Sequence, residues 1–194
     1  LSLLKPGRFI NLHLGLSPYY RGSGTNFWPF VNNELENVGS TILHIDPGVD
    51  TGDIVKQRIY PITDEDDYNS LLKIAYNECA SILYEAIKEI QEGNSNRISQ
   101  NTIHPVGFYC GRRGIGDEII NWNQSSREVF NFIRSINKPG PMATTYIEDI
   151  KVFINKSRLI EFAPNYICTP GQLLAKTKDG FLIKTADNFL EIYE

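Results

Sequence analysis

The sequence has few cysteines, no long apolar run and no excess of basic charge, and each lack excludes a class of protein. Without about 18 consecutive apolar residues, it offers no ordinary membrane-spanning helix. A net charge of −4 argues against nonspecific nucleic-acid binding, which depends on clustered lysine and arginine. The three cysteines are far apart and lack metal-ligand spacing, which favours a reducing compartment, so we expect a cytoplasmic protein.

What is present is the composition of a globular protein. Hydrophobic residues make up 41% and charged residues 22% of the 194 residues, enough for one domain or for a truncated domain and a small one. Residues 2–7 are typical of a helix tail ended by Pro-Gly, and residues 8–13 of a buried parallel strand. A parallel strand needs neighbours on both sides, so we expect further residues before Leu1.

The first part of the chain alternates strand and helix signals, which predicts an α/β domain over residues 1–104. Thr63 followed by acidic residues predicts the start of its longest helix, because a hydroxyl caps the first turn and acids suit the helix dipole. The expected elements are a short helix at 25–31, strands at 38–45 and 53–60, and a long helix at 64–92.

The remaining chain predicts a linker and a small β-rich region. Glycine and proline punctuate residues 105–118, which we interpret as the linker. Ser125 or Ser126 caps a helix that Pro-Gly-Pro at residues 139–141 ends. Short strands separated by turn signals then predict a barrel-like domain over residues 119–194. We expect these strands at 143–147, 150–154, 159–162, 172–177, 181–185 and 189–193.

Three polar residues lie at the ends of short apolar runs: Asn11 and His13 in the first strand, and Asp50 between the next two strands. A rigid amide can donate to a tetrahedral oxyanion, and a neutral imidazole can take a proton from an amine. We therefore predict that Asn11 donates, His13 relays a proton and Asp50 orients the imidazole. Gly48 and Gly52 are expected to supply the positive φ that the turn around Asp50 needs.

Each of these residues also has an ordinary structural interpretation, and other sites are only weakly indicated. A histidine at a strand end is often a packing residue, and Asp-Thr-Gly at residues 50–52 is common in turns. Aspartic proteases carry the same tripeptide but need a second copy, which is missing here. His13, His44 and Asp46 show no recognised ligand spacing, so we predict no metal site. The Arg112–Arg113 pair suits either a phosphate or a solvated loop.

Ordered motifs run through residues 9–58: Asn-Leu-His at 11–13, Ser-Pro-Tyr-Tyr-Arg-Gly at 17–22, Val-Gly-Ser-Thr-Ile at 38–42 and Gly-Val-Asp-Thr-Gly-Asp at 48–53. Together they resemble the catalytic core of the 10-formyltetrahydrofolate-dependent formyltransferases. The resemblance implies that residues 1–104 are the C-terminal part of a Rossmann-like domain, with 10-formyltetrahydrofolate as cosubstrate. It also implies catalytic roles for Asn11, His13 and Asp50, cofactor contacts from Gly48, Val49 and Asp50, and substrate contacts from Tyr20, Arg21 and Gly22.

A second resemblance covers residues 119–194. Trp122, the Pro-Gly-Pro-Met-Ala run at 139–143 and the Pro-Gly at 170–171 are similar to the C-terminal barrel of methionyl-tRNA formyltransferase and its sugar-modifying relatives. Two departures stand out near the histidine. Leu14-Gly15 replaces a frequent Pro-Ser, and Ser17 stands where leucine is common. The N-terminal part of the Rossmann-like domain, which supplies much of the folate pocket, is absent from this chain.

The family formylates three kinds of amine: methionyl-tRNA, glycinamide ribonucleotide and the amino sugar of a nucleotide-linked sugar. The charge balance lacks the basic surface that a tRNA enzyme needs, and the compact glycinamide enzyme lacks the second β-region. We therefore expect a nucleotide-linked amino sugar, with no nucleic-acid or membrane partner. Methionyl-tRNA formyltransferase, a formyl-folate hydrolase and a noncatalytic binding module remain alternatives, and a homodimer stays open.

Overall fold

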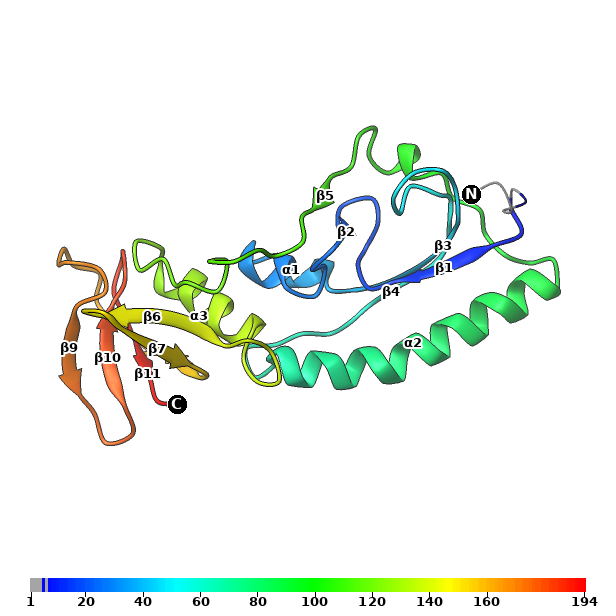
Figure 1. Cartoon of the computed structure of the whole chain (residues 1–194). Helices are drawn as coiled ribbons and strands as arrows, with labels where there is room; N and C mark the ends of the chain where they lie inside the picture. Colours follow the sequence, from blue (N-terminus) through cyan, green and yellow to red (C-terminus); the bar gives the residue numbers. More distant parts are fainter. Residues whose placement is uncertain (1–4, 6) are drawn as a thin grey trace. The chain divides into compact units, whose positions relative to one another are not determined.

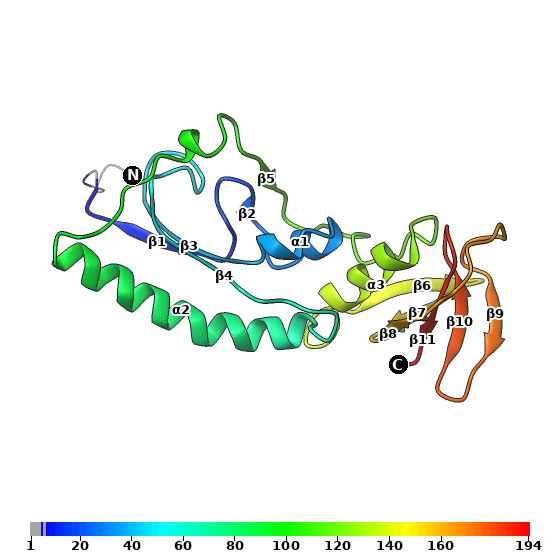
Figure 2. The same ribbon diagram turned by 180° about the vertical axis from the view of Figure 1, so that it is seen from behind.

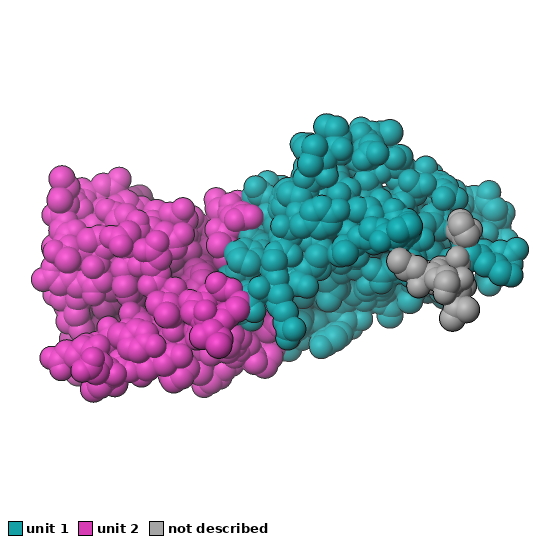
Figure 3. Space-filling model, turned by 45° about the horizontal axis from the view of Figure 1, so that its top comes forward, with its two compact units in different colours: residues 1–29, 34–65, 70–113 teal, residues 30–33, 66–69, 114–194 magenta. Residues whose placement is uncertain are grey.

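The computed structural model describes Lys5 and residues 7–194. The predicted helix tail at residues 2–7 therefore lies outside the described residues, apart from Lys5 and Gly7. Among the described residues, every helix is too short or too polar to cross a membrane. The chain divides into two compact units (Figure 3). Unit 1 comprises residues 1–29, 34–65 and 70–113, and unit 2 comprises residues 30–33, 66–69 and 114–194.

A three-stranded sheet forms the centre of unit 1 (Figure 1). Its strands are β1 (Ile10–His13), β3 (Gly39–His44) and β4 (Ile54–Ile59), hydrogen-bonded in the order β1-β3-β4. Each lies inside a predicted strand and is shorter by one or two residues at its ends. The apolar pattern, alternating in the second and third strands, therefore located all three strands.

The direction of β1 differs from the expectation of a parallel strand at residues 8–13. In the described sheet β1 runs antiparallel to β3, with Asn11 opposite Leu43 and His13 opposite Thr41. A short apolar run reports burial and not strand direction, so the sequence pattern had no means to distinguish the two pairings. The antiparallel register matters because it fixes the height of Asn11 and His13 on the sheet.

One long helix, α2 (Tyr68–Gln91), lies along one face of this sheet in both views (Figures 1 and 2). Ile10 and Leu12 of β1 pack on that side against the core cluster. Because successive side chains of a strand point to opposite faces, Asn11 and His13 lie on the face away from the cluster. The cluster comprises Ile42, Val55, Ile82 and Ala86.

The start of α2 corrects the predicted boundary at residue 64. The hydroxyl of Thr63 accepts a hydrogen bond from the backbone N–H of Glu65 at 3.3 Å, so it closes a local turn. The helix begins at Tyr68, whose N–H donates to the side chain of Asn137 at 3.1 Å. Thr63 therefore serves a turn rather than the helix, because its side chain competes for a nearby backbone donor.

Short elements complete unit 1. β2 (Arg21–Gly22) pairs in parallel with β5 (Tyr109–Cys110), and Ile98 forms an isolated antiparallel bridge with Ile54. The segment after α2 therefore contacts the sheet through Ile98, and the chain belongs to unit 1 as far as residue 113. The remaining short helices of unit 1 are η1 (Leu35–Asn37) and η2 (Gln100–Thr102), and the short helix α1 (Trp28–Val31) belongs to unit 1 only as far as Pro29.

Unit 2 contains the helix α3 (Ser126–Ser135), which a capping box starts. The hydroxyl of Ser125 accepts from the N–H of Glu128 at 3.3 Å, and the Glu128 carboxylate accepts from the N–H of Ser125 at 2.8 Å. These two bonds satisfy donors that every helix start leaves without partners. Of the two serines that the sequence suggested, Ser125 is therefore the cap.

The β-structure of unit 2 has two parts, and every strand but one lies within its predicted range. The exception is β8 (Ser157–Leu159), which the sequence placed at 159–162, because its pairing with Leu190–Ile192 and not its own apolar pattern sets its bounds. A hairpin and a four-stranded antiparallel sheet are separate in the described pairings, with β8 and β9 at the edges of the sheet. A closed barrel would pair those edges, so the barrel-like expectation is not confirmed. The hairpin is β6 (Ala143–Ile147) and β7 (Ile150–Ile154), and the sheet is β8 (Ser157–Leu159), β11 (Phe189–Ile192), β10 (Phe181–Lys184) and β9 (Leu173–Lys176).

The contact between α2 and the sheet makes a direct prediction for stability. Ile82 is fully buried in the core cluster, so Ile82→Ala should lower the free energy of unfolding of unit 1 by about 2–5 kcal/mol. Urea unfolding followed by Trp28 fluorescence in a Trp122→Phe background would measure it, because Trp28 lies in unit 1. The control Tyr84→Ala removes an exposed side chain and should change little. Equal losses in both variants would contradict this packing.

An ion-pair network between β4 and α2 predicts a pH dependence. The hydrogen bond from Arg58, followed by those from Lys56 and Ser81, lowers the pKa of Glu85 to about 2 against the opposing effect of burial. A carboxyl whose pKa is lowered on folding stabilises the protein above its ordinary pKa of 4.5, and this stabilisation is lost as the pH falls towards 2. Glu85→Gln should therefore lower the urea midpoint at neutral pH and have no effect near pH 2.

The same fluorescence measurement at the two pH values tests this expectation. Glu92→Gln, directly after the end of α2, is the matched control, because the Glu92 carboxylate lies 3.9 Å from Lys88 and is half exposed. A Glu85→Gln midpoint that drops equally at both pH values would show that the carboxylate charge is not the cause.

Candidate active site

His13, the last residue of β1, is buried with 7% of its surface exposed. Its Nε2 lies 2.6 Å from the carbonyl oxygen of Tyr20. Since a carbonyl oxygen only accepts, Nε2 carries the hydrogen, and the lone pair of the neutral ring is on Nδ1. Nδ1 lies 3.5 Å from Oδ2 of Asp50. The site thus holds a basic nitrogen beside a carboxylate.

Asp50 is the point at which the predicted residues meet. Its Oδ1 accepts a hydrogen bond from Nδ2 of Asn11 at 3.2 Å, and its Oδ2 accepts one from the backbone N–H of Gly22 at 2.9 Å. With His13 Nδ1 at 3.5 Å, the structure brings the amide, the imidazole and the carboxylate together. Their catalytic roles stay predictions at this point.

The turn that carries Asp50 is built differently from the expectation. The positive φ, 53°, falls on Asp50 itself and not on Gly48 or Gly52. Aspartate adopts this left-handed region more readily than most residues. A Cβ added at Gly52 would collide with the carbonyl of His44, and one at Gly48 with the hydroxyl of Thr51. Both glycines are therefore required by close contact and not by their own φ.

The arrangement can move a proton and stabilise negative charge. When Nδ1 of His13 takes a proton, its contact with the Asp50 carboxylate at 3.5 Å becomes one between opposite charges. Asn11 is half-buried, and its amide carries a second N–H besides the one bonded to Asp50. That N–H can donate to an oxyanion that forms beside the site.

The segment predicted to contact substrate is mostly enclosed by protein. Tyr20 is fully buried, and its hydroxyl donates to the Glu34 carboxylate at 2.6 Å. Arg21 is 4% exposed, and its guanidinium donates to the Gln100 side chain and to the carbonyl of Val106. Gly22 is half-buried and donates its N–H to Asp50. The side chains of Tyr20 and Arg21 therefore bond to other protein groups in the interior. Their contact with a substrate stays a prediction.

The loop predicted to contact a cofactor has one exposed apolar side chain. Asp46 closes this loop, because its Oδ1 accepts from the N–H of Gly48 at 3.0 Å and from the hydroxyl of Thr51 at 2.6 Å. Val49 is 60% exposed, whereas the next residue, Asp50, turns its side chain inwards. The loop thus presents Val49 outwards and a carboxylate inwards, and its binding of a cofactor stays a prediction.

Gln100 is the residue that sequence reasoning missed. It is 2% exposed, and its amide donates to the carbonyl oxygens of Asp50 at 2.8 Å and Gly52 at 2.7 Å. It lies in η2, within a polar segment where a single glutamine has no distinguishing pattern. Gln100 reaches the site because its segment pairs with the sheet, through the backbone bridge between Ile98 and Ile54.

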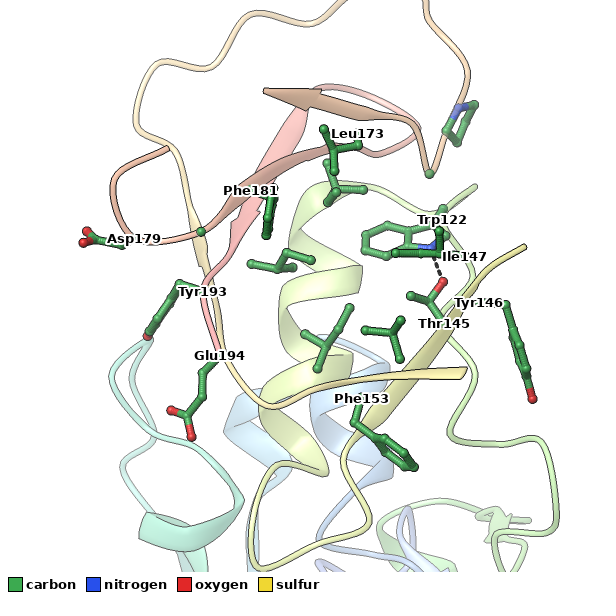
Figure 4. Close-up of a pocket in the computed structure, with 17 residues that line it drawn as sticks. Trp122, Thr145, Tyr146, Ile147, Phe153, Leu173, Asp179, Phe181, Tyr193 and Glu194 are labelled. Atoms are coloured by element: carbon green, nitrogen blue, oxygen red, sulfur yellow. Dashed lines mark hydrogen bonds between the residues drawn. The ribbon is translucent and has the colours of Figure 1, made fainter. Parts of the chain in front are cut away.

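Unit 2 has an apolar hollow of about 730 Å³ between the β6–β7 hairpin and the sheet (Figure 4). Trp122 lies on its wall and donates to the hydroxyl of Thr145 at 2.9 Å. The acids that line it are paired: Asp179 lies 3.3 Å from Arg158, and Glu194 lies 3.5 Å from Lys156. The hollow has the size of a ligand site, but its described acids are engaged, so it is a weaker candidate for chemistry.

Two other sequence candidates have no support as reactive sites. Arg113 lies over the ring of Phe27, 5.0 Å from the ring centroid, which gives this arginine a packing partner. Within the described part of the chain, no group of three or more histidine, cysteine or acidic side chains could hold a metal ion.

Comparison with known proteins gives two family matches. Residues 3–87 match the family described as formyl transferase, and residues 116–194 match the one described as formyl transferase, C-terminal domain. The methionyl-tRNA formyltransferase of Carboxydothermus hydrogenoformans is 34% identical over 192 residues, which cover 98% of this chain and 60% of the relative. That of Staphylococcus aureus strain MW2 is 32% identical over 188 residues, or 97% and 58%. The chain thus spans about 60% of the length of these curated relatives.

Two solved structures of similar fold are formyltransferases by their descriptions. WlaRD, a sugar 3N-formyl transferase in the presence of dTDP and 5-N-formyl-THF, has a TM-score of 0.76 and 29% identity, covering 96% of this chain and 65% of that one. The N-formyltransferase from Helicobacter canadensis, in complex with folinic acid and dTDP-3-aminofucose, has a TM-score of 0.67, with the same identity and coverage.

The contact between Gly15 and His13 predicts the effect of a single methyl group. A Cβ at residue 15 would lie 2.5 Å from the Tyr20 carbonyl oxygen and 2.7 Å from Nε2 of His13. Gly15→Ala should therefore break the hydrogen bond between His13 and Tyr20, seen in NMR spectra as loss of the protected Nε2–H signal of His13. Gly111→Ala is the control, because the added Cβ would meet no other described residue within 4 Å, apart from the two chain neighbours of Gly111. An unchanged His13 signal in Gly15→Ala would contradict the geometry.

Proposed function

The chain belongs to the formyl transferase family, and we propose from this that its Asn11–His13–Asp50 site transfers a formyl group from 10-formyltetrahydrofolate to a primary amine. The observation that carries the proposal is the meeting of Asn11 and His13 at the Asp50 carboxylate, at 3.2 and 3.5 Å. Since the chain spans about 60% of its curated relatives, the reaction, cosubstrate and acceptor all belong to the proposal.

In the proposed reaction the amine nitrogen attacks the formyl carbon, whose oxygen becomes an oxyanion. Asn11 donates its second N–H to that oxyanion, a kind of contact whose loss typically costs ~10²–10³ in rate. The His13–Asp50 pair accepts the proton that the amine loses and delivers it to the folate nitrogen as the bond between that nitrogen and the formyl carbon breaks. The products are a formamide and tetrahydrofolate, and His13 returns to its neutral state.

Two loops are proposed to border the reactants. Residues 48–50 would contact the folate, where the exposed side chain of Val49 offers an apolar surface to a ring system. Residues 20–22 would border the acceptor, with Tyr20 and Arg21 holding the segment from the protein interior. The folates named in the descriptions of two similar structures, 5-N-formyl-THF and folinic acid, support a folate as the formyl carrier.

The acceptor that we propose is the amino group of a nucleotide-linked sugar. The two similar structures are described with dTDP and with dTDP-3-aminofucose. The charge of unit 2 also favours a small acceptor, because Lys151, Lys156 and Arg158 each form an ion pair with a carboxylate of the same unit. Basic side chains neutralised in this way contribute little to binding a polyanion such as tRNA.

Methionyl-tRNA is the second candidate acceptor. Curated relatives up to 34% identical over almost the whole chain are named methionyl-tRNA formyltransferases. This similarity keeps a nucleic-acid acceptor open, in spite of the net negative charge of the chain.

Mass spectrometry of both acceptors tests the proposal. The full-length protein is incubated with 10-formyltetrahydrofolate and either a dTDP-linked amino sugar or methionyl-tRNA. We expect the sugar to gain one formyl group. Formylation of the tRNA alone would establish the second candidate, release of tetrahydrofolate without an acceptor would indicate a hydrolase, and no turnover of any kind would contradict formyl transfer.

Substitutions at the site give a quantitative expectation for the same assay. His13→Ala should lower the transfer rate by ~10²–10⁴, because it removes the group that accepts the proton. Asn11→Ala should lower it by ~10²–10³, because it removes an oxyanion donor. His44→Gln is the control and should retain near-normal transfer, because His44 pairs with Ile10 whereas His13 pairs with Thr41, three residues earlier in β3. A near-normal transfer rate in His13→Ala would contradict the proposed mechanism.

A further inference from the structure

Gln100 uses every hydrogen-bonding position of its side chain within the site. Its two N–H groups reach the carbonyl oxygens of Asp50 at 2.8 Å and Gly52 at 2.7 Å, and its oxygen accepts from Nε and Nη2 of Arg21 at 2.9 and 2.7 Å. A primary amide has two donors and two acceptor lone pairs, so this one is saturated. With 2% exposure, no water competes for these contacts, and the side chain acts as a fixed clamp.

One end of this clamp holds the backbone of the turn that carries Asp50. Asp50 has a φ of 53°, a conformation that is uncommon for a residue with a side chain, although aspartate adopts it more readily than most, so bonds to the turn help to hold it. Gln100 donates hydrogen bonds to two carbonyl oxygens of the turn, that of Asp50 and that of Gly52. Gln100 therefore opposes relaxation of the turn, which would swing the carboxylate away.

The other end holds Arg21, and through it the partners of both reactive groups. The residue before Arg21 is Tyr20, whose carbonyl accepts from Nε2 of His13. The residue after it is Gly22, whose N–H donates to the Asp50 carboxylate at 2.9 Å. A side chain that fixes Arg21 thus fixes the backbone to which His13 and Asp50 are both bonded.

We propose that Gln100 is a positioning residue of the reaction: by joining Arg21 to the Asp50 turn, it sets the 3.5 Å separation between His13 Nδ1 and the Asp50 carboxylate. This inference rests on the proposed function. Gln100 lies 50 residues after Asp50 in the chain, and its side chain connects the Asp50 turn to Arg21, whose two neighbours, Tyr20 and Gly22, bond to His13 and Asp50.

The test compares Gln100→Met with a matched control, Gln57→Met. Methionine keeps the length of glutamine but makes none of its amide hydrogen bonds. Gln57 also donates two hydrogen bonds from its amide, to the carbonyl of Ser17 at 2.7 Å and to the hydroxyl of Thr41 at 2.9 Å, neither of which carries the Asp50 turn. Gln100→Asn, which retains the amide but is one methylene shorter, is the conservative variant.

Hydrogen exchange in the protein without substrate provides the first readout. The amide of Gly22 reports the position of the Asp50 carboxylate, and that of Ile42 reports the core of the sheet. Gln100→Met should raise the exchange rate of Gly22 by ~10-fold or more and leave Ile42 unchanged, because the opening is local. Gln57→Met should leave Gly22 unchanged. Equal acceleration at Gly22 and Ile42, or the same effect in Gln57→Met, would reduce Gln100 to a general structural role and overturn the inference.

Formyl transfer provides the second readout. Gln100→Met should lower kcat by ~10–100-fold with little change in KM, because the reactive groups are displaced while the reactants still bind. The kcat of Gln100→Asn should lie between those of Gln100→Met and the unaltered protein. If Gln100→Met does not fold, the kcat of Gln100→Asn tests the inference instead. Unchanged kcat in both variants would overturn the inference. Accelerated exchange at Gly22 in a protein that formylates no acceptor would instead overturn the proposed function and support the link between Gln100 and Asp50.

Discussion

The carboxylate of Asp50 is only 12% exposed, and a charged group so enclosed needs partners. It has three: the Asn11 amide, the Gly22 backbone N–H and the imidazole of His13. Asn11 and His13 come from β1 and Gly22 from β2, whereas Asp50 itself lies in the turn between β3 and β4. If the carboxylate moved, Asn11 and Gly22 would lose an acceptor and His13 its neighbouring charge, so the geometry of the site depends on this one group.

The two faces of the sheet separate stability from chemistry. On one face Ile10 and Leu12 pack with the core cluster under α2. Between them and beyond them in the strand, Asn11 and His13 point to the other face, where polar groups of the loops meet them. The apolar contacts hold β1 in place, and they thereby restrict the motion of Asn11 and His13 on its other face. A strand therefore positions these two side chains better than a loop would, because its packed face restricts its motion.

The local elements could be predicted largely from sequence. The apolar pattern located most strands of both units, with β8 displaced from residues 159–162 to 157–159, and the serine before α3 indicated its cap. The errors concern features that depend on distant residues. The direction of β1 depends on its neighbour β3, and the start of α2 on where Thr63 directs its hydroxyl. The closure of a barrel depends on edge strands that do not pair in the described sheet. Strand direction, this helix start and barrel closure leave no periodic pattern of apolar residues within a single segment of the sequence.

The sequence by itself determined which chemical groups are present and which face of each strand they occupy, because alternation and turn residues are local properties. It thereby nominated Asn11, His13 and Asp50 together, although they are separated by up to 39 residues. Only the tertiary structure decided that the positive φ falls on Asp50, that Tyr20 and Arg21 are enclosed, and that Gln100 joins the site. These outcomes depend on which segments come into contact, and the free energy of such contacts is shared between residues far apart in the chain.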